Sequence, residues 1–256
     1  MEEENKDKKE ISNKKEISNK KAIIAIIMII VLLVILCVVY ATIFNSTNDN
    51  CEDIEDNEET AFYPPADIPD YGIEVKKPII YIYPEQETKV TVKLGRPENL
   101  THTYPKYDNS WEVIAKPNGD LLDCKTGRNL YALYWEGINT VEPNMEEGFI
   151  VKGEDTIKFL EEKLEILGLN EREANEFIIY WLPKLENNKY NFIRFQTEEE
   201  INSNMPLEIT PAPDTIIRVM MEFRILEEEI KLQEQKLETP ERTGYTVIEW
   251  GGTEIK

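Results

Sequence analysis

The chain has 256 residues, of which 50 are Asp or Glu and 29 are Lys or Arg, so its formal net charge is −21. This excess of acid repels polyanions, so we exclude nucleic acid as a partner and expect partners that are neutral, cationic or bridged by metal. The alternative is that the acidity only keeps an exported domain soluble. One histidine and three cysteines exclude a histidine-rich metal site and a disulfide framework, and we expect no metal and no cofactor.

Residues 22–44 are the most apolar stretch of the chain. They include no charged residue, and a helix of this length spans about 34 Å, enough to cross the roughly 30 Å hydrocarbon core of a bilayer. A cleaved signal peptide is the alternative, but its apolar core would be only about 7–15 residues long. The pattern therefore predicts one transmembrane helix that acts as an uncleaved signal-anchor, through which the chain contacts the membrane.

Lysines flank this stretch on its N-terminal side. Residues 1–21, in which the hexapeptide KEISNK occurs twice, are predicted to be a disordered leader. No Lys or Arg follows the span before Lys76, whereas the leader has seven lysines: Lys6, Lys8, Lys9, Lys14, Lys15, Lys20 and Lys21. The positive-inside rule then places the N-terminus in the cytoplasm and residues 45–256 outside the cell membrane.

Residues 45–75 are rich in Asn, Asp and Glu and then in Pro, which predicts an acidic, flexible linker. Cys37 falls within the predicted span, which leaves Cys51 in the linker and Cys124 in the next segment. A bridge between these two is the alternative that an oxidising compartment allows. Because the linker holds Cys51 at no fixed distance from Cys124, we expect free thiols instead.

Residues 76–252 are predicted to form one globular domain. Short runs rich in β-branched and aromatic residues, separated by turn residues, predict strands. These strands fall at 78–83, 88–94, 100–104, 110–115, 119–124, 129–135, 189–195, 206–210, 215–225 and 244–250. Within 88–94, alternate residues (Val90, Val92 and Leu94) are expected to face the core.

Two helices interrupt the strands. The first is expected at 155–167 and ends at Gly168, and the second at 171–182 and ends at Pro183. Residues 226–239 fit either a helix or an edge strand. The fold class is therefore α+β: a single transmembrane helix followed by one β-rich, sandwich-like extracytoplasmic domain with two helices.

Acids and aromatic residues are the remaining candidates for chemistry. The chain has no serine-hydrolase elbow, P-loop or dinucleotide fingerprint, and His102 is expected to be a surface or strand-packing residue. Weak catalytic candidates are the acids that end predicted strands, and candidate ligand-binding residues are the tryptophans, whose rings stack on sugars. The acids are Glu136, Asp214 and Glu249, and the tryptophans are Trp111, Trp135 and Trp250. The alternative is that these aromatic residues, Trp181 included, fill the core and that Glu249-Trp250-Gly251-Gly252 leads into a tight turn.

Several motifs carry a family resemblance. They are KPIIYIYPEQETKVTVKL (77–94), LTHTYPKYDNSWEVIAKPNGDLLD (100–123), YALYWEG (131–137), NEFIIYWLPKLENNKYNFIRF (175–195), PAPDTIIRVMMEF (211–223) and GYTVIEWGG (244–252). They resemble a family of uncharacterised, mostly microbial proteins with KPVIYLYP, YLFWEG, YWLP and VEWGG motifs and no established activity. The resemblance implies one domain over 76–252 and transfers no chemistry. It points first to segments 77–84, 135–137 and 249–252.

The sequence favours a surface-tethered binding or interaction module of bacterial type without catalysis. Its partner would be a neutral glycan or an envelope protein. The alternative is an acid/base hydrolase acting on cell-envelope glycan, which needs two of the candidate carboxylates within about 10 Å in one cleft. A third hypothesis is a structural partner of another membrane protein.

Overall fold

The structure is a computed structural model that describes residues 28, 33–35, 72–139 and 142–255. The chain divides into two compact units, Met1–Asp53 and Ile54–Lys256. In the first unit, residues 28 and 33–35 are helical, and the rest of the predicted leader and span lies outside the described residues. No helix within the described residues is long and apolar enough to cross a membrane.

The second unit is α+β and is built on two sheets. Sheet A has eight strands in the order β12 (Gln233–Glu234), β8 (Glu147–Lys152), β9 (Tyr190–Phe195), β11 (Thr215–Leu226), β13 (Thr246–Glu254), β1 (Ile73–Tyr83), β7 (Leu133–Asn139) and β3 (Leu100–Tyr104). Sheet B has five strands in the order β10 (Leu207–Thr210), β2 (Thr88–Leu94), β4 (Trp111–Ala115), β5 (Leu121–Asp123) and β6 (Asn129–Leu130). Neighbours pair antiparallel except β11 with β13 and β12 with β8, which are parallel.

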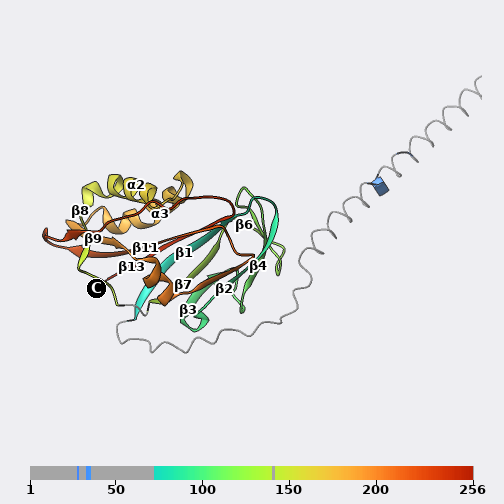
Figure 1. Cartoon of the computed structure of the whole chain (residues 1–256), viewed down its shortest axis with the longest axis horizontal. Helices are drawn as coiled ribbons and strands as arrows, with labels where there is room; N and C mark the ends of the chain where they lie inside the picture. The colour runs from blue at the N-terminus through green and yellow to red at the C-terminus, as the bar shows by residue number, and fades with distance from the viewer. Residues whose placement is uncertain (1–27, 29–32, 36–71, 140–141, 256) are drawn as a thin grey trace, which may run out of the picture. The chain divides into compact units, whose positions relative to one another are not determined.

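Helices α2 (Thr156–Ile166) and α3 (Glu171–Leu185) lie over one face of sheet A, and sheet B lies on the other side (Figure 1). A third helix, α4 (Glu198–Asn204), and two 3₁₀ turns, Pro97–Asn99 and Gly153–Asp155, connect strands. The domain therefore has three layers, with sheet A in the middle. Its β-rich, sandwich-like character agrees with the fold class expected from the sequence.

Each face of sheet A packs against its own core. On β1, Ile80 and Ile82 belong to the core between the two sheets, whereas Ile79 and Tyr81 belong to the core beneath the helices. Successive residues of a strand point to opposite faces, so a strand in a middle layer has apolar residues at consecutive positions. This explains the unbroken run IIYIY in β1.

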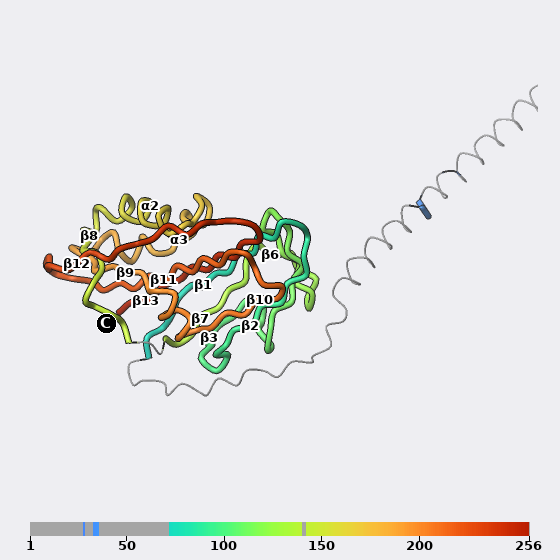
Figure 2. Tube along the Cα trace, in the orientation of Figure 1, coloured from blue at the N-terminus to red at the C-terminus, as the bar shows by residue number. Residues whose placement is uncertain are grey.

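The segment after β11 returns along the helix side of the domain before β13 begins (Figure 2). Arg242 in this segment donates to both carboxylate oxygens of Glu173 at 2.9 and 3.0 Å. Glu173 also completes a capping box with Asn170 at the start of α3. One carboxylate thus joins the return segment to the helix, and the guanidinium supplies the charge that a fully buried Glu requires.

Several predicted boundaries differ from the structure. β1 begins at Ile73, inside the predicted linker, and the predicted strand 129–135 is divided between β6 and β7. Residues 226–239 contain no helix and only the two-residue strand β12. The sequence did not predict β8 or α4.

Two predictions of where a helix or strand ends are also wrong. Helix α3 continues through Pro183 to Leu185, because burial of Leu185 in the core outweighs the one hydrogen bond that proline removes. The residues Gly251 and Gly252 form no tight turn, since β13 runs through both. A Cβ at Gly252 would lie 2.7 Å from the Trp181 ring, so glycine here lets the strand lie against that ring.

Cys124 follows β5 and takes part in a disulfide bond, so the expectation of a free thiol at this position is wrong. Its partner lies outside the described residues, as do Cys37 and Cys51.

Candidate functional site

The tryptophans predicted to bind a ligand lie in the core. Trp111, Trp135 and Trp250 are at most 2% exposed, and Trp181 is 1% exposed. Trp111 and Trp135 fill the space between the sheets, and Trp250 packs beneath the helices. A buried indole presents no face to a ligand, so the predicted tryptophan surface is wrong. The indole rings lie in the core, where their burial removes a large apolar area from water.

The three candidate carboxylates do not share a cleft. Glu249 is fully buried on the face of sheet A towards sheet B, where it accepts hydrogen bonds from Trp135 Nε1 at 2.7 Å and from Arg218 Nε at 2.6 Å. Glu136 is the residue after Trp135 on β7, so it projects from the opposite face. Asp214 accepts from the backbone N–H of Tyr245 at 2.8 Å. Two of the three are thus held by structural partners, and the pair required by the hydrolase hypothesis is missing.

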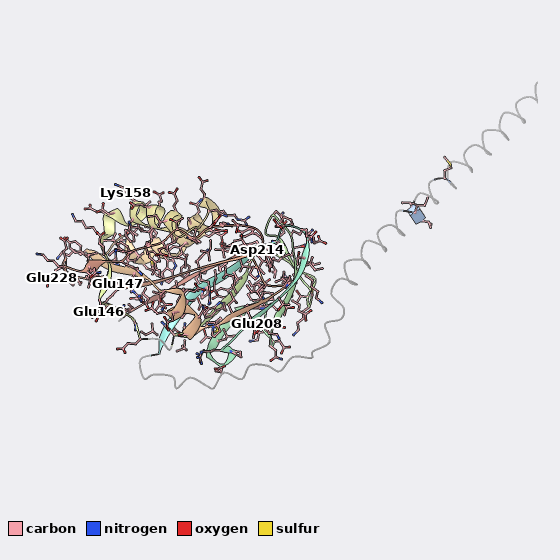
Figure 3. The ribbon with its side chains drawn as sticks, viewed as in Figure 1. Glu146, Glu147, Lys158, Glu208, Asp214 and Glu228 are labelled. Atoms are coloured by element: carbon pink, nitrogen blue, oxygen red, sulfur yellow. The ribbon has the colours of Figure 1, made fainter. Side chains whose placement is uncertain are left out.

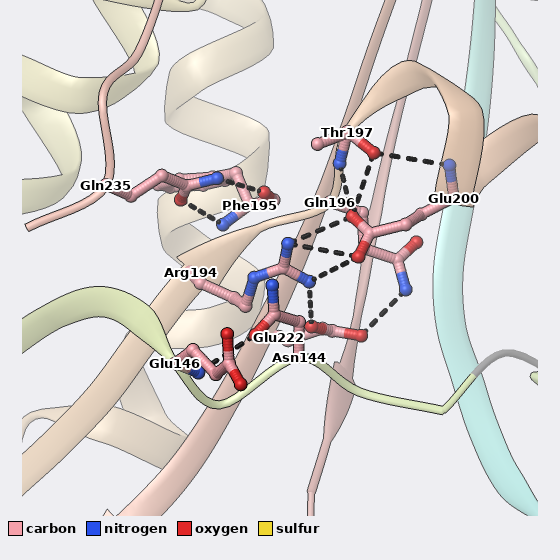
Figure 4. Close-up of polar contacts among 9 residues, drawn as sticks. All are labelled: Asn144, Glu146, Arg194, Phe195, Gln196, Thr197, Glu200, Glu222 and Gln235. Atoms are coloured by element: carbon pink, nitrogen blue, oxygen red, sulfur yellow. Dashed lines mark hydrogen bonds and ion pairs between the residues drawn. The ribbon is translucent and has the colours of Figure 1, made fainter. Parts of the chain in front are cut away.

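A second group of buried charges joins β9, β11 and α4 (Figure 4). Arg194 donates to Glu222 at 2.8 Å and to both oxygens of Glu200, at distances of 2.9–3.1 Å. Gln196 donates to the other oxygen of Glu222 at 2.8 Å. Because every carboxylate oxygen of this group has a donor, its role is structural.

The acids on the surface are spread rather than gathered over one element. Glu208 and Glu228, for example, lie at well-separated places on the domain (Figure 3). Within the described part of the chain, no group of three or more His, Cys, Asp or Glu is arranged to hold a metal ion.

An open pocket of about 510 Å³ lies on the helix-facing side of sheet A, where β1, β3, β7 and α3 meet. Four tyrosines from separate parts of the fold line it: Tyr104 at the end of β3, Tyr131 between β6 and β7, Tyr134 on β7 and Tyr180 on α3. Tyr104 and Tyr131 are 51% and 47% exposed. We call this site the tyrosine pocket.

A β-bulge in β1 brings Lys77 to the tyrosine pocket. The pairing of β1 with both of its neighbours shifts register just before Ile79. Lys77 has φ of 61°, in the left-handed region that a residue with a side chain rarely adopts, and such a conformation costs on the order of 1–3 kcal/mol. Strain of this kind persists where the surrounding structure holds it in place. Strained backbone conformations occur at functional sites more often than elsewhere.

Glu136 holds this bulge. One carboxylate oxygen accepts from the backbone N–H of Lys77 at 3.2 Å, and the other lies 3.3 Å from the Lys76 ammonium. His102 on the neighbouring strand β3 places Nδ1 3.8 Å from the same carboxylate and is exposed, as expected for a surface residue. Of the three predicted acids, Glu136 is therefore the one that lies at an open site.

Burial is the main cause that raises the pKa of both Tyr134 and Tyr180, and the negative charge of Glu136 raises each pKa further. Burial also raises the pKa of Tyr131. These phenols therefore keep their protons at neutral pH, and each can donate one hydrogen bond and accept another.

A larger hollow of about 910 Å³ lies near the ends of β1 and β13. Its described lining is mostly charged and aliphatic and includes one aromatic residue, Trp181. The tyrosine pocket is the better candidate for ligand binding, because it combines several aromatic rings with polar groups that point to one place.

Sequence reasoning missed the four tyrosines, and it singled out Lys77 only as part of the segment 77–84. The available signal was Pro78, which cannot donate to a sheet ladder and so marks an irregularity within an otherwise apolar strand. Two of the three segments singled out by the family resemblance, 77–84 and 135–137, contribute residues to the tyrosine pocket. Comparisons of the chain with protein-family models, with curated proteins and with solved structures give no match.

Proposed function

We propose that this chain is a single-pass membrane protein whose extracytoplasmic domain binds a glycan in the tyrosine pocket. Support for the anchor comes from the uncharged stretch 22–44 and from the lysines confined to its N-terminal side. Support for binding comes from the pocket. The observation that carries the proposal is the convergence of four tyrosine rings, a carboxylate and an ammonium group on one open site.

Sugars need this combination of groups. The C–H face of a pyranose ring packs on an aromatic ring, and its hydroxyls require donors and acceptors around the rim. In the tyrosine pocket the exposed rings of Tyr104 and Tyr131 supply the stacking faces, and the phenol groups of Tyr134 and Tyr180 supply hydrogen bonds. Glu136 and Asn129 add an acceptor group and an amide at the same site.

The alternative function, an acid/base hydrolase on envelope glycan, has less support. Such an enzyme needs a second carboxylate facing the scissile bond. Glu249 projects from the face of sheet A opposite to Glu136, and Asp214 lies before β11, where it accepts a hydrogen bond from the backbone of Tyr245. Glu136 itself is held by Lys76 and by the backbone of Lys77.

Protease protection tests the membrane topology. Protease added outside intact cells should remove the domain and leave a small fragment with residues 1–44, whereas inside-out vesicles should protect the domain. Protection of the domain in intact cells would contradict the proposed orientation.

Glycan binding is tested with the detergent-solubilised full chain on an array of neutral and acidic oligosaccharides, followed by titration of any that bind. Tyr104→Ala and Tyr131→Ala should each weaken binding about three- to tenfold, because an aromatic contact contributes about 0.5–1.5 kcal/mol. Ile179→Ala is the matched control, since Ile179 is an apolar residue on α3 that is 73% exposed and lies outside the pocket. Binding that survives both tyrosine substitutions would place the ligand elsewhere.

A further inference from the structure

One ammonium group at the tyrosine pocket has no acidic partner among the described residues. The Glu136 carboxylate lies 3.3 Å from the Lys76 ammonium, which also contacts Glu74 at 2.9 Å, and it receives a further hydrogen bond from the backbone of Lys77. The side chain of Lys77 also lines the pocket, with Nζ 5.5 Å from the centre of the Tyr180 ring. Within residues 72–139 and 142–255, no carboxylate lies within ion-pair distance of this ammonium.

Two other cations near the pocket lie against aromatic rings. The Lys184 ammonium lies 5.8 Å from the centre of the same Tyr180 ring, and the Arg172 guanidinium, which pairs with Glu176 at 3.6 Å, lies 5.7 Å from the Tyr131 ring centre. Contact with an aromatic face stabilises a cation only modestly at an open site, and it leaves the ammonium protons free to bind an anion. Of the two charged residues that line the pocket, Lys77 is thus the one without an oppositely charged partner in the described part of the chain.

The bulge fixes where this charge lies. With φ in the left-handed region and its backbone N–H bound to Glu136, Lys77 places Nζ over the Tyr180 ring. A lysine on a regular part of β1 would project perpendicular to the sheet, on one face or the other according to its position in the strand. The strained conformation therefore serves to place one ammonium group among the tyrosines.

We infer that the glycan bound in the tyrosine pocket carries a carboxylate, as in a uronic acid, and that Lys77 recognises this group. The inference rests on the proposed glycan-binding function and names the class of sugar. The sugar ring stacks on the exposed tyrosines, and its carboxylate accepts hydrogen bonds from Nζ of Lys77. The overall acidity of the domain favours neutral partners, but the ligand meets the local charge of the pocket rather than the average of the surface.

The experiment compares matched sugars that differ only in the group at C6 of each ring. Trigalacturonate is titrated against galactotriose, and the trimer of β-1,4-glucuronate against cellotriose, with the full-length protein in detergent. In each pair, the carboxylate on every ring of the acidic sugar is replaced by a hydroxymethyl group. At low salt, the acidic member of at least one pair should bind roughly tenfold or more tightly than its neutral member, because a hydrogen bond to a charged group is worth more than one to a hydroxyl.

The variant Lys77→Met keeps the length of the side chain and removes its charge. It should abolish the preference, so that the two sugars of each pair bind with equal affinity. The control Lys184→Met removes a charge over the same tyrosine ring from a residue outside the pocket lining, so it should preserve the preference. Tryptophan fluorescence of each variant checks that the domain is folded.

The possible outcomes separate the inference from the proposed function. Equal affinity for acidic and neutral sugars, or a preference that persists in Lys77→Met, would overturn the inference and leave glycan binding intact. Absence of binding across both pairs and the array would overturn both. Inorganic phosphate and acetate serve as competitors: if either displaces the acidic sugar at equal concentration, the pocket recognises a free anion and the inference is wrong.

Discussion

Removal of Arg194 should be among the most damaging single substitutions outside the apolar core. The side chains of Arg194 and Glu222 are each 1% exposed, and the pair lies 2.8 Å apart. In Arg194→Met the Glu222 carboxylate stays buried with no cation, although Gln196 still donates to it. Breaking a buried pair from one side costs about 3–5 kcal/mol. With a urea dependence of about 2 kcal/mol/M, the unfolding midpoint should fall by roughly 1.5–2.5 M.

Tryptophan fluorescence during urea unfolding is a suitable assay, because all four tryptophans belong to the β-rich domain and are buried. The control is Lys125→Met, which removes an exposed ion pair with Asp108 and should leave the midpoint unchanged. The double variant Arg194→Met, Glu222→Leu should recover part of the loss, since it leaves no unpaired charge between β9 and β11. If Arg194→Met behaves like Lys125→Met, the reasoning about this charge group is wrong.

Three further predictions concern pH, packing and the disulfide. Burial would raise the pKa of Glu200, but hydrogen bonds from the Arg194 guanidinium and from Thr197 outweigh burial and lower this pKa below its ordinary value of 4.5. The stability that ionised Glu200 contributes should therefore be lost as the pH falls below that value. Glu200→Gln should therefore flatten the acid limb of an unfolding-midpoint profile, and an unchanged limb would contradict this. Gly252→Ala should destabilise the domain by about 1–3 kcal/mol, because the new Cβ would lie 2.7 Å from the backbone oxygen of Met221 and from the Trp181 ring. Gly72→Ala should be neutral in the same unfolding assay, because its Cβ would lie 3.7 Å from the nearest atom, on Ile138. We predict that Cys51 is the disulfide partner of Cys124, so Cys51→Ser should add one free thiol to a titration of the denatured, unreduced chain, and a thiol count that falls by one would exclude this partner.

Local patterns predicted much of the fold. Strands β2 and β3 match the predicted ranges 88–94 and 100–104, because alternation of apolar and polar residues is a property of consecutive residues. The start of α3 matches for the same reason, since a capping box is contained within four residues. Helix α4 was missed because its sequence EEEINSN is short and polar, although Thr197 and Glu200 form the same kind of capping box.

The site could not be predicted in this way. Tyr104, Tyr134 and Tyr180 are far apart in the chain, and they meet because β1, β7 and β3 are consecutive in sheet A and α3 crosses above them. Composition does not show which aromatic residues become buried: the tryptophans and Tyr81 are in the core, whereas Tyr104 and Tyr131 are exposed. The candidate carboxylates were predicted from their positions at the ends of strands, but the role of Glu136 and Glu249 depends on which face of sheet A each one occupies.

The position of β13 has a consequence for how the domain is made. This strand follows all the other described strands in the chain, yet it lies between β11 and β1 in the middle of sheet A. A nascent chain therefore cannot join the two halves of the sheet until residues 246–254 have been synthesised. Before then both halves expose unpaired strand edges. Sheet A therefore closes only after its last described strand has left the ribosome.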